Sequence, residues 1–248
     1  MKDLFSEQAA EYARYRPSYP AELFEYIYSF ITEHKAAWDC ATGNGQAALH
    51  LAQHFDQVIA SDISTAQLAL APSAPNIQYV NCPAENTPFP LHHFDLITVA
   101  QAYHWFNWEA FRKEVARVGK PDAVIAVWTY DLIISDDRKL NDLILHFYRN
   151  IVGQYWDAER KWVEEHYQTI PFPYKPLPSK EFSILQQFSR EDLIGFFTSW
   201  SASQKYLRAN GQAATGMIQK HLESIWPKNE ERTFRYPVYL KVGRVSEP

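Results

Sequence analysis

Short apolar runs alternate with segments whose apolar residues recur at helical spacing over the first 130 residues. This pattern predicts strands and helices in alternation, which is typical of an α/β fold with a parallel sheet. The predicted helices cover 20–34, 45–54, 65–71 and 108–118, and the predicted strands cover 36–41, 57–61, 76–80, 94–99 and 122–129. Ser64 and Gln67 form a capping box that predicts where the helix at 65–71 begins.

The pattern changes after the fifth predicted strand. Residues 136–168 are predicted to be helical and are rich in aromatic side chains, whereas four prolines between Ile170 and Lys180 must interrupt any helix. Residues 182–188 are predicted to form a sixth strand, and Ser189 to Asp192 to cap the helix after it. The last strand is predicted over 232–245. Pro237 within it favours an edge position or a bulge, because proline cannot donate to a ladder.

The segment Trp38 to Gln46, WDCATGNGQ, joins a buried strand to a helix through a turn with two glycines. The chain has only 8 glycines, so Gly43 and Gly45 on either side of Asn44 indicate a conformational requirement. Glycine allows a positive φ and lets a ligand approach the backbone closely. The free N–H groups of the following helix point back at this turn. An α/β sheet binds nucleotide-like ligands in this way, at the carboxyl end of its first strand.

Two features of the turn indicate which ligand it suits. A dinucleotide-binding turn has the pattern GxGxxG, whereas this chain has Ala48 in the third glycine position, a replacement that some dinucleotide folds allow. The stronger difference is Asp39, an acid inside the strand four residues before Gly43. A carboxylate there is a poor neighbour for a pyrophosphate but suits a ligand with a positive charge or an amino group. S-adenosylmethionine carries both a sulfonium and an α-ammonium group.

Five motifs, in order, resemble those of the class I S-adenosylmethionine-dependent methyltransferases over roughly the first 130 residues. They are FSEQAAEYARYRPSYP at 5–20, the turn from Asp39 to Gly45, the strand that ends at Asp62, the loop CPAENTPF at 82–89, and FDLITVAQAYHWF at 94–106. The N-terminal motif is similar to the branch that includes trans-aconitate methyltransferase, where such a segment folds over the cofactor. The resemblance implies a Rossmann-like open sheet of about seven strands, mostly parallel with an antiparallel last strand. It also implies helices on both faces and a helical insert after the fifth strand.

We expect a single methyltransferase domain over residues 1–248, a length that can bury a substantial core. Its expected parts are an N-terminal cover at 1–19, a cofactor-binding core at 20–130, a mainly helical insert at 131–180, and C-terminal strands and helices at 181–248 that complete the sheet. Phe5, Tyr12, Tyr15 and Tyr19 in the N-terminal segment suit a movable cover.

The resemblance assigns cofactor contacts to the carboxyl ends of the strands. Asp62 is expected to bind both ribose hydroxyls, and the 82–89 loop to flank adenine. Many relatives carry an acid where this chain has Pro83, so adenine must rely on main-chain groups near Ala84, on Glu85, or on stacking against Ile63. The expected cofactor-binding residues are Arg16, Asp39, Gly43, Asn44, Gly45, Gln46, Asp62, Ile63, Ala84, Glu85, Gln101 and Ala102.

Two charged residues in this set have a second interpretation. Arg16 either binds the cofactor carboxylate through its guanidinium or is a solvated charge at a helix end. Asp39 either contacts the amino group of the cofactor or only hydrogen-bonds the amides of the turn, since a buried acid must find partners.

His104 is the titratable residue expected beside the methyl-transfer site. It is either a general base that takes a proton from an acceptor hydroxyl or amine, or a residue that shapes the pocket. A carboxylate acceptor would need no base, because methyl transfer from a sulfonium has a good leaving group. The expected acceptor is a small molecule, and the expected acceptor-binding residues are Tyr12, His104, Trp105 and Tyr130.

The aromatic-rich insert is expected to place most of its rings in the core and some over the acceptor. Arg149, Arg160 and His166 in this region either bind an acidic acceptor or are ordinary surface charges.

Composition narrows the remaining classes. The net charge of −5, without a cluster of Lys and Arg, argues against a nucleic-acid substrate. No apolar run approaches the roughly 20 residues that span a bilayer, and the segment MKDLFSEQ has no signal-peptide core. We therefore expect a cytoplasmic protein without a membrane partner. Cys40 and Cys82 show no metal-binding spacing, and no metal is expected.

Two alternatives from other classes stay open. One is an NAD-dependent oxidoreductase, which a titration with NADH would separate from a methyltransferase. The other is a non-catalytic module that binds S-adenosylmethionine without turnover.

Overall fold

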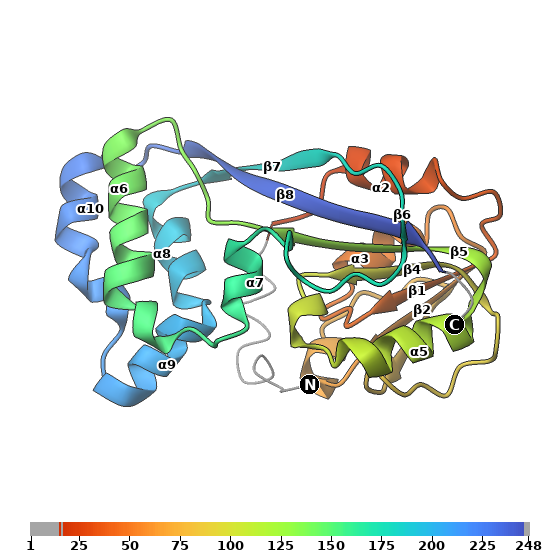
Figure 1. Ribbon diagram of the computed structural model, residues 1–248. Coiled ribbons are helices and arrows are strands. Elements are labelled where there is room, and N and C mark those ends of the chain that lie inside the picture. Colours follow the sequence, from red (N-terminus) through yellow and green to blue (C-terminus); the bar gives the residue numbers. More distant parts are fainter. Residues whose placement is uncertain (1–14, 16, 246–248) are drawn as a thin grey trace.

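Eight strands form one open sheet in the computed structural model, which describes Tyr15 and residues 17–245 (Figure 1). They are β1 (Ala36–Cys40), β2 (Gln57–Asp62), β3 (Ile77–Asn81), β4 (Phe94–Ala100), β5 (Gly119–Tyr130), β6 (Lys175–Pro176), β7 (Glu181–Phe188) and β8 (Arg232–Arg244). The order is β3-β2-β1-β4-β5-β8-β6, and β7 also pairs with β8. Strands β1 to β5 are parallel, and β8 is antiparallel to β5. The predicted Rossmann-like sheet with an antiparallel last strand is confirmed, with eight strands rather than about seven.

Helices cover both faces of the parallel part of the sheet. Apolar residues of α2 (Ala21–Tyr28) and α3 (Gln46–Leu51) pack into one core cluster, and those of α5 (Trp108–Val118) pack into the other. Side chains of β1 alternate between the two clusters: Ala37 faces the first, whereas Trp38 and Cys40 face the second. This alternation follows from the two-residue period of a strand and explains why β1 is apolar except for Asp39.

Several helices end before the sequence predicts. The structure ends α2 at Tyr28 instead of 34, α3 at Leu51 instead of 54, and α4 (Thr65–Leu68) at Leu68 instead of 71. After each end the backbone continues in turns with bonds between residues three apart, such as Ile31 to Tyr28 and Ala71 to Leu68. Such tight last turns are common at helix ends.

The predicted helix starts are confirmed at two caps. Ser64 Oγ accepts the amide of Gln67 at the start of α4. Ser189 and Asp192 form a full capping box at the start of α8 (Arg190–Thr198).

Pro237 lies in a stretch of β8 that β7 alone pairs, which is the edge-like position that the sequence predicts. Residues 232–239 of β8 pair with β7, and residues 238–244 pair with β5. The Pro237 carbonyl accepts the amide of Asp131, which follows the end of β5. Since the N and O of one residue point to the same side of an antiparallel strand, the missing N–H faces a gap. This gap lies between the end of β5 and the isolated bridge of Ile134 with Arg235, where the ladder needs no donor.

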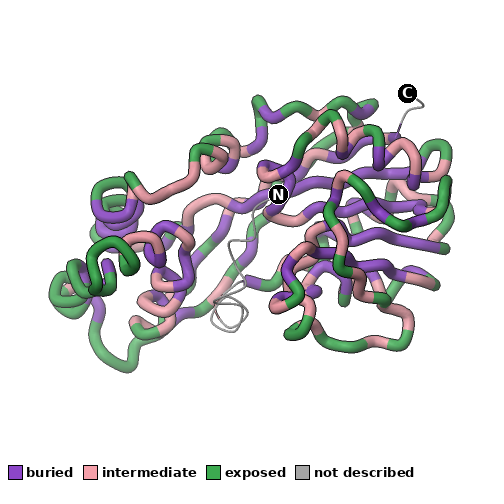
Figure 2. The backbone as a smooth tube through the Cα atoms, turned by 90° about the horizontal axis from the view of Figure 1, so that it is seen from below, coloured by how far each residue is buried: buried purple, intermediate pink, exposed green. Residues whose placement is uncertain are grey.

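Beyond the parallel sheet, β7 and β8 extend to a helical lobe made of α6 (Arg138–His146), α8, α9 (Ser201–Asn210) and α10 (Gln219–Ile225) (Figure 1). The short helix α7 (Arg160–Glu164) lies between the lobe and the sheet. The first core cluster runs without interruption from Leu23 of α2 through Trp128 of β5 to Trp200 of the lobe. Figure 2 shows the strands as largely buried and the outer turns of the helices as exposed. The helices after β7 thus join those of the predicted 131–180 insert in one lobe.

Candidate functional site

A cleft, here called the turn cleft, lies at the carboxyl ends of β1 and β4, where the glycine turn was expected to bind a ligand. Its lining includes five residues of the turn and the helix after it: Ala41, Thr42, Gly43, Asn44 and Gln46. The remaining lining residues come from the N-terminal side, from α3, and from the ends of β4 and β5: Pro17, Tyr19, Ala47, Ala100, Gln101 and Tyr130. The structure thus brings the expected Gly43, Asn44, Gln46 and Gln101 together around one space.

The two turn glycines have the conformation that the sequence predicts. Gly43 has φ +58° and Gly45 has φ +81°, and Gly45 is the N-cap of α3. A Cβ on Gly45 would lie 2.6 Å from Tyr79 Oη and 3.3 Å from Ala71 Cβ. Gly45 therefore packs closely against Tyr79 of β3 and does not line the turn cleft, whereas Gly43 lines it. The first glycine thus lines the cleft, and the second allows the close packing of the turn.

Asp62 holds the turn in place. Its Oδ2 accepts the amide of Gly43 (2.9 Å), and its Oδ1 accepts the amide of Ser64 (2.8 Å). Only 8% of the residue is exposed. These two bonds fix the carboxylate between the turn and the residues after β2. Asp62 does not line the turn cleft, and its expected ribose role stays a prediction.

Asp39 lies behind the turn and is 1% exposed. Its Oδ1 accepts from Thr98 Oγ1 at 2.8 Å and its Oδ2 from Thr42 Oγ1 at 2.5 Å. Burial raises the pKa of this carboxyl to about 6, against the lowering effect of the hydrogen bonds from Thr42 and Thr98. Asp39 does not line the turn cleft. Of its two expected roles, the geometry favours that of holding the turn.

The other expected cofactor residues lie on neighbouring strand ends. Ile63 directly follows β2, and the loop with Ala84 and Glu85 follows β3, which pairs with β2 in parallel. Ala84 is buried, and Glu85 Oε1 accepts the amide of Asn107, the N-cap of α5. Ala102 is buried at the end of β4. These four residues do not line the turn cleft.

Two expected site residues, Tyr12 and Arg16, lie outside the residues that the structure describes. Six residues that line the turn cleft were missing from the expected set: Pro17, Tyr19, Ala41, Thr42, Ala47 and Ala100. The Tyr19 ring packs edge-on against Trp128 of β5 at 5.3 Å. Tyr15 packs on Gly195 of the lobe, where a side chain would collide with its ring. The aromatic content of the N-terminal segment was the signal that could have indicated Tyr19.

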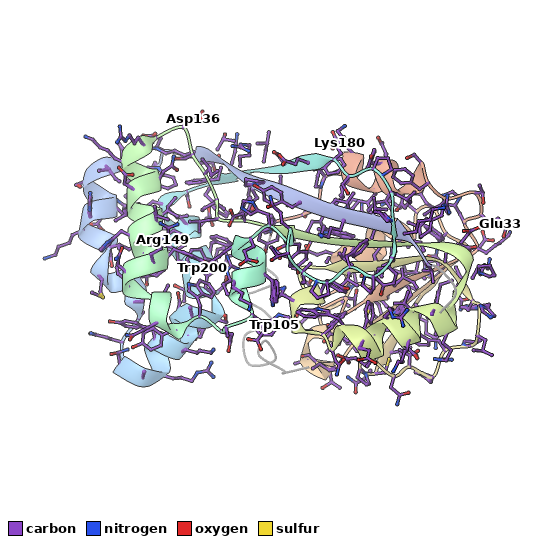
Figure 3. The ribbon with its side chains drawn as sticks, in the orientation of Figure 1. Glu33, Trp105, Asp136, Arg149, Lys180 and Trp200 are labelled. Atoms are coloured by element: carbon purple, nitrogen blue, oxygen red, sulfur yellow. The ribbon has the colours of Figure 1, made fainter. Side chains whose placement is uncertain are left out.

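A second cleft, here called the aromatic cleft, lies between the sheet and the helical lobe. The core side contributes Gln101, His104, Trp105, Tyr130, Asp131 and Leu132, and the other side contributes Trp156, Asp157, Arg160, Phe196, Trp200 and Ser201. Figure 3 labels Trp105 and Trp200, one from each side of the cleft. Gln101 and Tyr130 line both the turn cleft and the aromatic cleft, so the two spaces are neighbours that share a wall.

The shared wall is held rigidly. Gln101 has φ +55°, its Oε1 accepts from Thr129 Oγ1 (2.6 Å), and its Nε2 donates to the Tyr130 carbonyl (3.2 Å). The Tyr130 ring packs edge-on against Tyr236 at 5.4 Å. A non-glycine residue in the left-handed region carries strain, which is commonly kept at functional sites.

His104 is 7% exposed, and its Nδ1 lies 2.7 Å from the hydroxyl of the buried Tyr167. Burial, followed by the charge of Arg160, lowers the pKa of His104 to about 3. Burial raises the pKa of Tyr167 above its usual value, so the phenol stays protonated. The imidazole is therefore neutral at physiological pH and is fixed by its partner. A group with such a low pKa is a weak proton acceptor, so the geometry favours pocket shaping over general base catalysis.

Over the described residues, no helix is long and apolar enough to cross a membrane. The same part of the chain has no group of three His, Cys, Asp or Glu side chains arranged to hold a metal ion.

Comparisons with known proteins agree with this geometry. Residues 38–127 match a family model described as a methyltransferase domain. A Dictyostelium discoideum protein named as a candidate methyltransferase is 30% identical over 249 residues, covering 98% of this chain and 95% of that protein. A solved structure from Anaeromyxobacter dehalogenans, titled as a candidate type II methyltransferase, is 32% identical with a TM-score of 0.85. It covers 93% of this chain and 98% of that one.

A third relative carries the cofactor in its name. A Saccharomyces cerevisiae protein named as a probable S-adenosylmethionine-dependent methyltransferase is 30% identical over 132 residues, which are 50% of this chain and 45% of that protein. The sequence left open a methyltransferase, an oxidoreductase and a non-catalytic module. The similarity to the Dictyostelium protein over nearly the full length of both chains supports the methyltransferase. This chain belongs to the class I S-adenosylmethionine-dependent methyltransferases.

Proposed function

We propose that the protein transfers the methyl group of S-adenosylmethionine to a small-molecule acceptor bound in the aromatic cleft. The observation that supports this most directly is the wall of Gln101 and Tyr130 that the two clefts share. A ligand in the turn cleft and a second one in the aromatic cleft would meet at this wall. The accepting atom is a carboxylate or hydroxyl oxygen. The cytoplasm is the proposed location.

The cofactor roles of individual residues belong to the same proposal. The turn around Gly43 leaves its backbone open to the amino-acid part of the ligand, since that glycine has a positive φ and lines the cleft. Asp62, held at the end of β2 by the amides of Gly43 and Ser64, binds the ribose hydroxyls. Arg16 and Tyr12 of the N-terminal cover complete the site, as in the trans-aconitate methyltransferase branch that this segment resembles. Tyr19 supports the cover by its packing on Trp128.

Methyl transfer mainly requires that the acceptor and the sulfonium are aligned and that water is excluded. Bound S-adenosylmethionine supplies an electrophilic methyl group: the acceptor oxygen provides the electron pair of the new bond, and the sulfur keeps the pair of the broken one. A carboxylate acceptor loses its charge in this step and releases no proton, whereas a hydroxyl releases one to water. The buried Tyr130 and the aromatic side chains of the cleft exclude water, and the fixed Gln101 orients the partners. Neutral His104 contacts the acceptor and shapes the pocket.

The proposal is tested in two steps. S-adenosylhomocysteine at about a hundred times its dissociation constant should stabilise the fold by roughly 2.7 kcal/mol, which for a chain of this size raises the melting temperature by about 5–10 °C. The protein is then incubated with S-adenosylmethionine and a panel of small acids, phenols and alcohols, and S-adenosylhomocysteine formation is measured. Turnover only with protein or nucleic-acid acceptors would contradict the proposal.

A further inference from the structure

Arg160 presents an oriented and mostly unused guanidinium to the aromatic cleft. Its Nε donates to Tyr148 Oη at 2.8 Å, and that hydroxyl donates to Glu164 at 2.7 Å. The guanidinium carbon lies 4.7 Å from the centre of the Trp156 ring and 5.3 Å from that of Tyr148. Arginine has five N–H donors, so four are left after the bond to Tyr148. Within the described part of the chain, no carboxylate lies within 4.0 Å of these donors.

The acidic residues of the cleft already have partners. Asp157 Oδ2 lies 2.6 Å from Lys205 Nζ. Asp131 Oδ1 accepts the amide of Leu132 (2.6 Å), and its Oδ2 bonds to His166 Nε2 (2.9 Å). Neither of these two acids pairs with Arg160. The guanidinium therefore keeps donors that can bind an anionic ligand in the cleft.

The charge of Arg160 acts inside the cleft and not only at its rim. Arg160 is the charged residue that contributes to lowering the pKa of His104, which stands on the opposite, core side. Stacking on Trp156 and the bond to Tyr148 hold the guanidinium in one orientation before any ligand binds, so little further entropy is lost on binding. A planar guanidinium with free donors matches the two oxygens of a carboxylate or the oxygens of a phosphate.

Resting on the proposed function, we infer that the acceptor carries an anionic group that Arg160 binds, and that this group is not the one methylated. The transfer takes place at the wall of Gln101 and Tyr130, which the turn cleft shares, and Arg160 does not line that cleft. A guanidinium bonded to the accepting oxygen would also withdraw the electron pair that must form the new bond. The anion therefore serves as an anchor that leaves the reaction unchanged, and Trp105, Trp156 and Trp200 enclose the apolar body between the two ends. Arg160 is thus a specificity-determining residue of the acceptor site.

The test measures ligand binding to protein saturated with S-adenosylhomocysteine by isothermal titration calorimetry. The probes are 3-phenylpropanoate, phenyl phosphate and benzenesulfonate, with 3-phenylpropanamide as the neutral match of the first. The variants are Arg160→Gln, which removes the charge, and Arg160→Lys, which keeps the charge but loses the planar fork. Arg149→Gln is the matched control, because Arg149 is an exposed cation of the same half of the chain that lines neither cleft (Figure 3).

We expect at least one anionic probe to bind the wild type and to lose about 10- to 100-fold in affinity in Arg160→Gln, since bonds to charged groups are worth that much. Arg160→Lys should fall between the two, and Arg149→Gln should match the wild type. The neutral amide should bind the wild type and Arg160→Gln equally. The inference is overturned if no anion binds the wild type better than it binds Arg160→Gln, or if Arg149→Gln causes the same loss. The affinity for S-adenosylhomocysteine should be the same in every variant, so a negative result with the anions would leave the proposed function intact. If the wild type does not bind S-adenosylhomocysteine at all, the proposed function itself is refuted.

Discussion

The buried carboxyl of Asp39 should make the stability of the fold depend on pH in a predictable direction. Its pKa is raised from 3.8 to about 6, mainly by burial. The folded state therefore binds the proton more tightly than the unfolded state does. The contribution of this carboxyl to the free energy of unfolding is largest below about pH 4, falls as the pH rises through about 6, and then levels off. A difference of about two units at roughly 1.36 kcal/mol each corresponds to about 3 kcal/mol.

Replacing Asp39 by Asn removes the titration while keeping the size of the side chain. The Thr42 and Thr98 hydroxyls that now donate to the carboxylate can accept from the new amide after rotation. The assay is urea unfolding of both proteins without ligand at pH values from about 4 to 7. The stability of Asp39→Asn relative to the wild type should rise by about 2.5 kcal/mol over this range. A packing difference that does not depend on pH would shift one curve by a constant amount and leave this rise unchanged.

An exposed carboxylate provides the control for this experiment. Asp142→Asn on α6, where the side chain is largely exposed, should track the wild type within about 0.5 kcal/mol at every pH. If the curves for Asp39→Asn and the wild type run parallel, the carboxyl is not shifted by its surroundings. The account of Asp39 as a buried support for the turn would then be refuted.

Three further outcomes follow from the site. Gly45→Ala should lower stability by about 1–3 kcal/mol, because a Cβ at this left-handed position meets Tyr79. Gly211→Ala is the control: this glycine is also left-handed but faces open space, so the substitution should cost about 1 kcal/mol. Thermal unfolding measures both losses, and equal losses would contradict the steric account. Asp62→Ala should weaken S-adenosylhomocysteine binding about ten- to a hundredfold by calorimetry while the fold survives, and a normal affinity would contradict its ribose role. Because the pKa of His104 is lowered to about 3, kcat/KM should show no ionisation of this group between pH 5 and 8, and His104→Gln should have the same pH profile as the wild type. A bell-shaped wild-type profile that becomes flat in His104→Gln would instead show that His104 is a general base.

The sequence determined those features that depend on local chemistry and on the order of elements. Two glycines around Asn44 required a turn with positive φ, and the structure has φ +58° and +81° there. The helix starts at Ser64 and Ser189 were readable because caps involve residues only three apart. Alternation of helices and strands predicted the parallel sheet, since a parallel connection needs a crossover of this length. The carboxyl ends of its strands then brought the expected Gly43, Asn44, Gln46 and Gln101 together around one cleft.

The tertiary structure decided what depends on which segments face one another. Pro237 fits into β8 because β5 ends at Tyr130, so no ladder on that side of β8 needs an N–H from residue 237; the two segments are about a hundred residues apart in the chain. Asp39 turned away from the turn cleft because Thr98, on another strand, supplies one of its partners. Arg160 and Trp105 line one cleft because α7 packs against the turn Tyr103–Trp105 after β4, although the two segments are far apart in the chain. Side-chain burial, partner choice and pKa arise from such long-range packing, and no local pattern of residues encodes them.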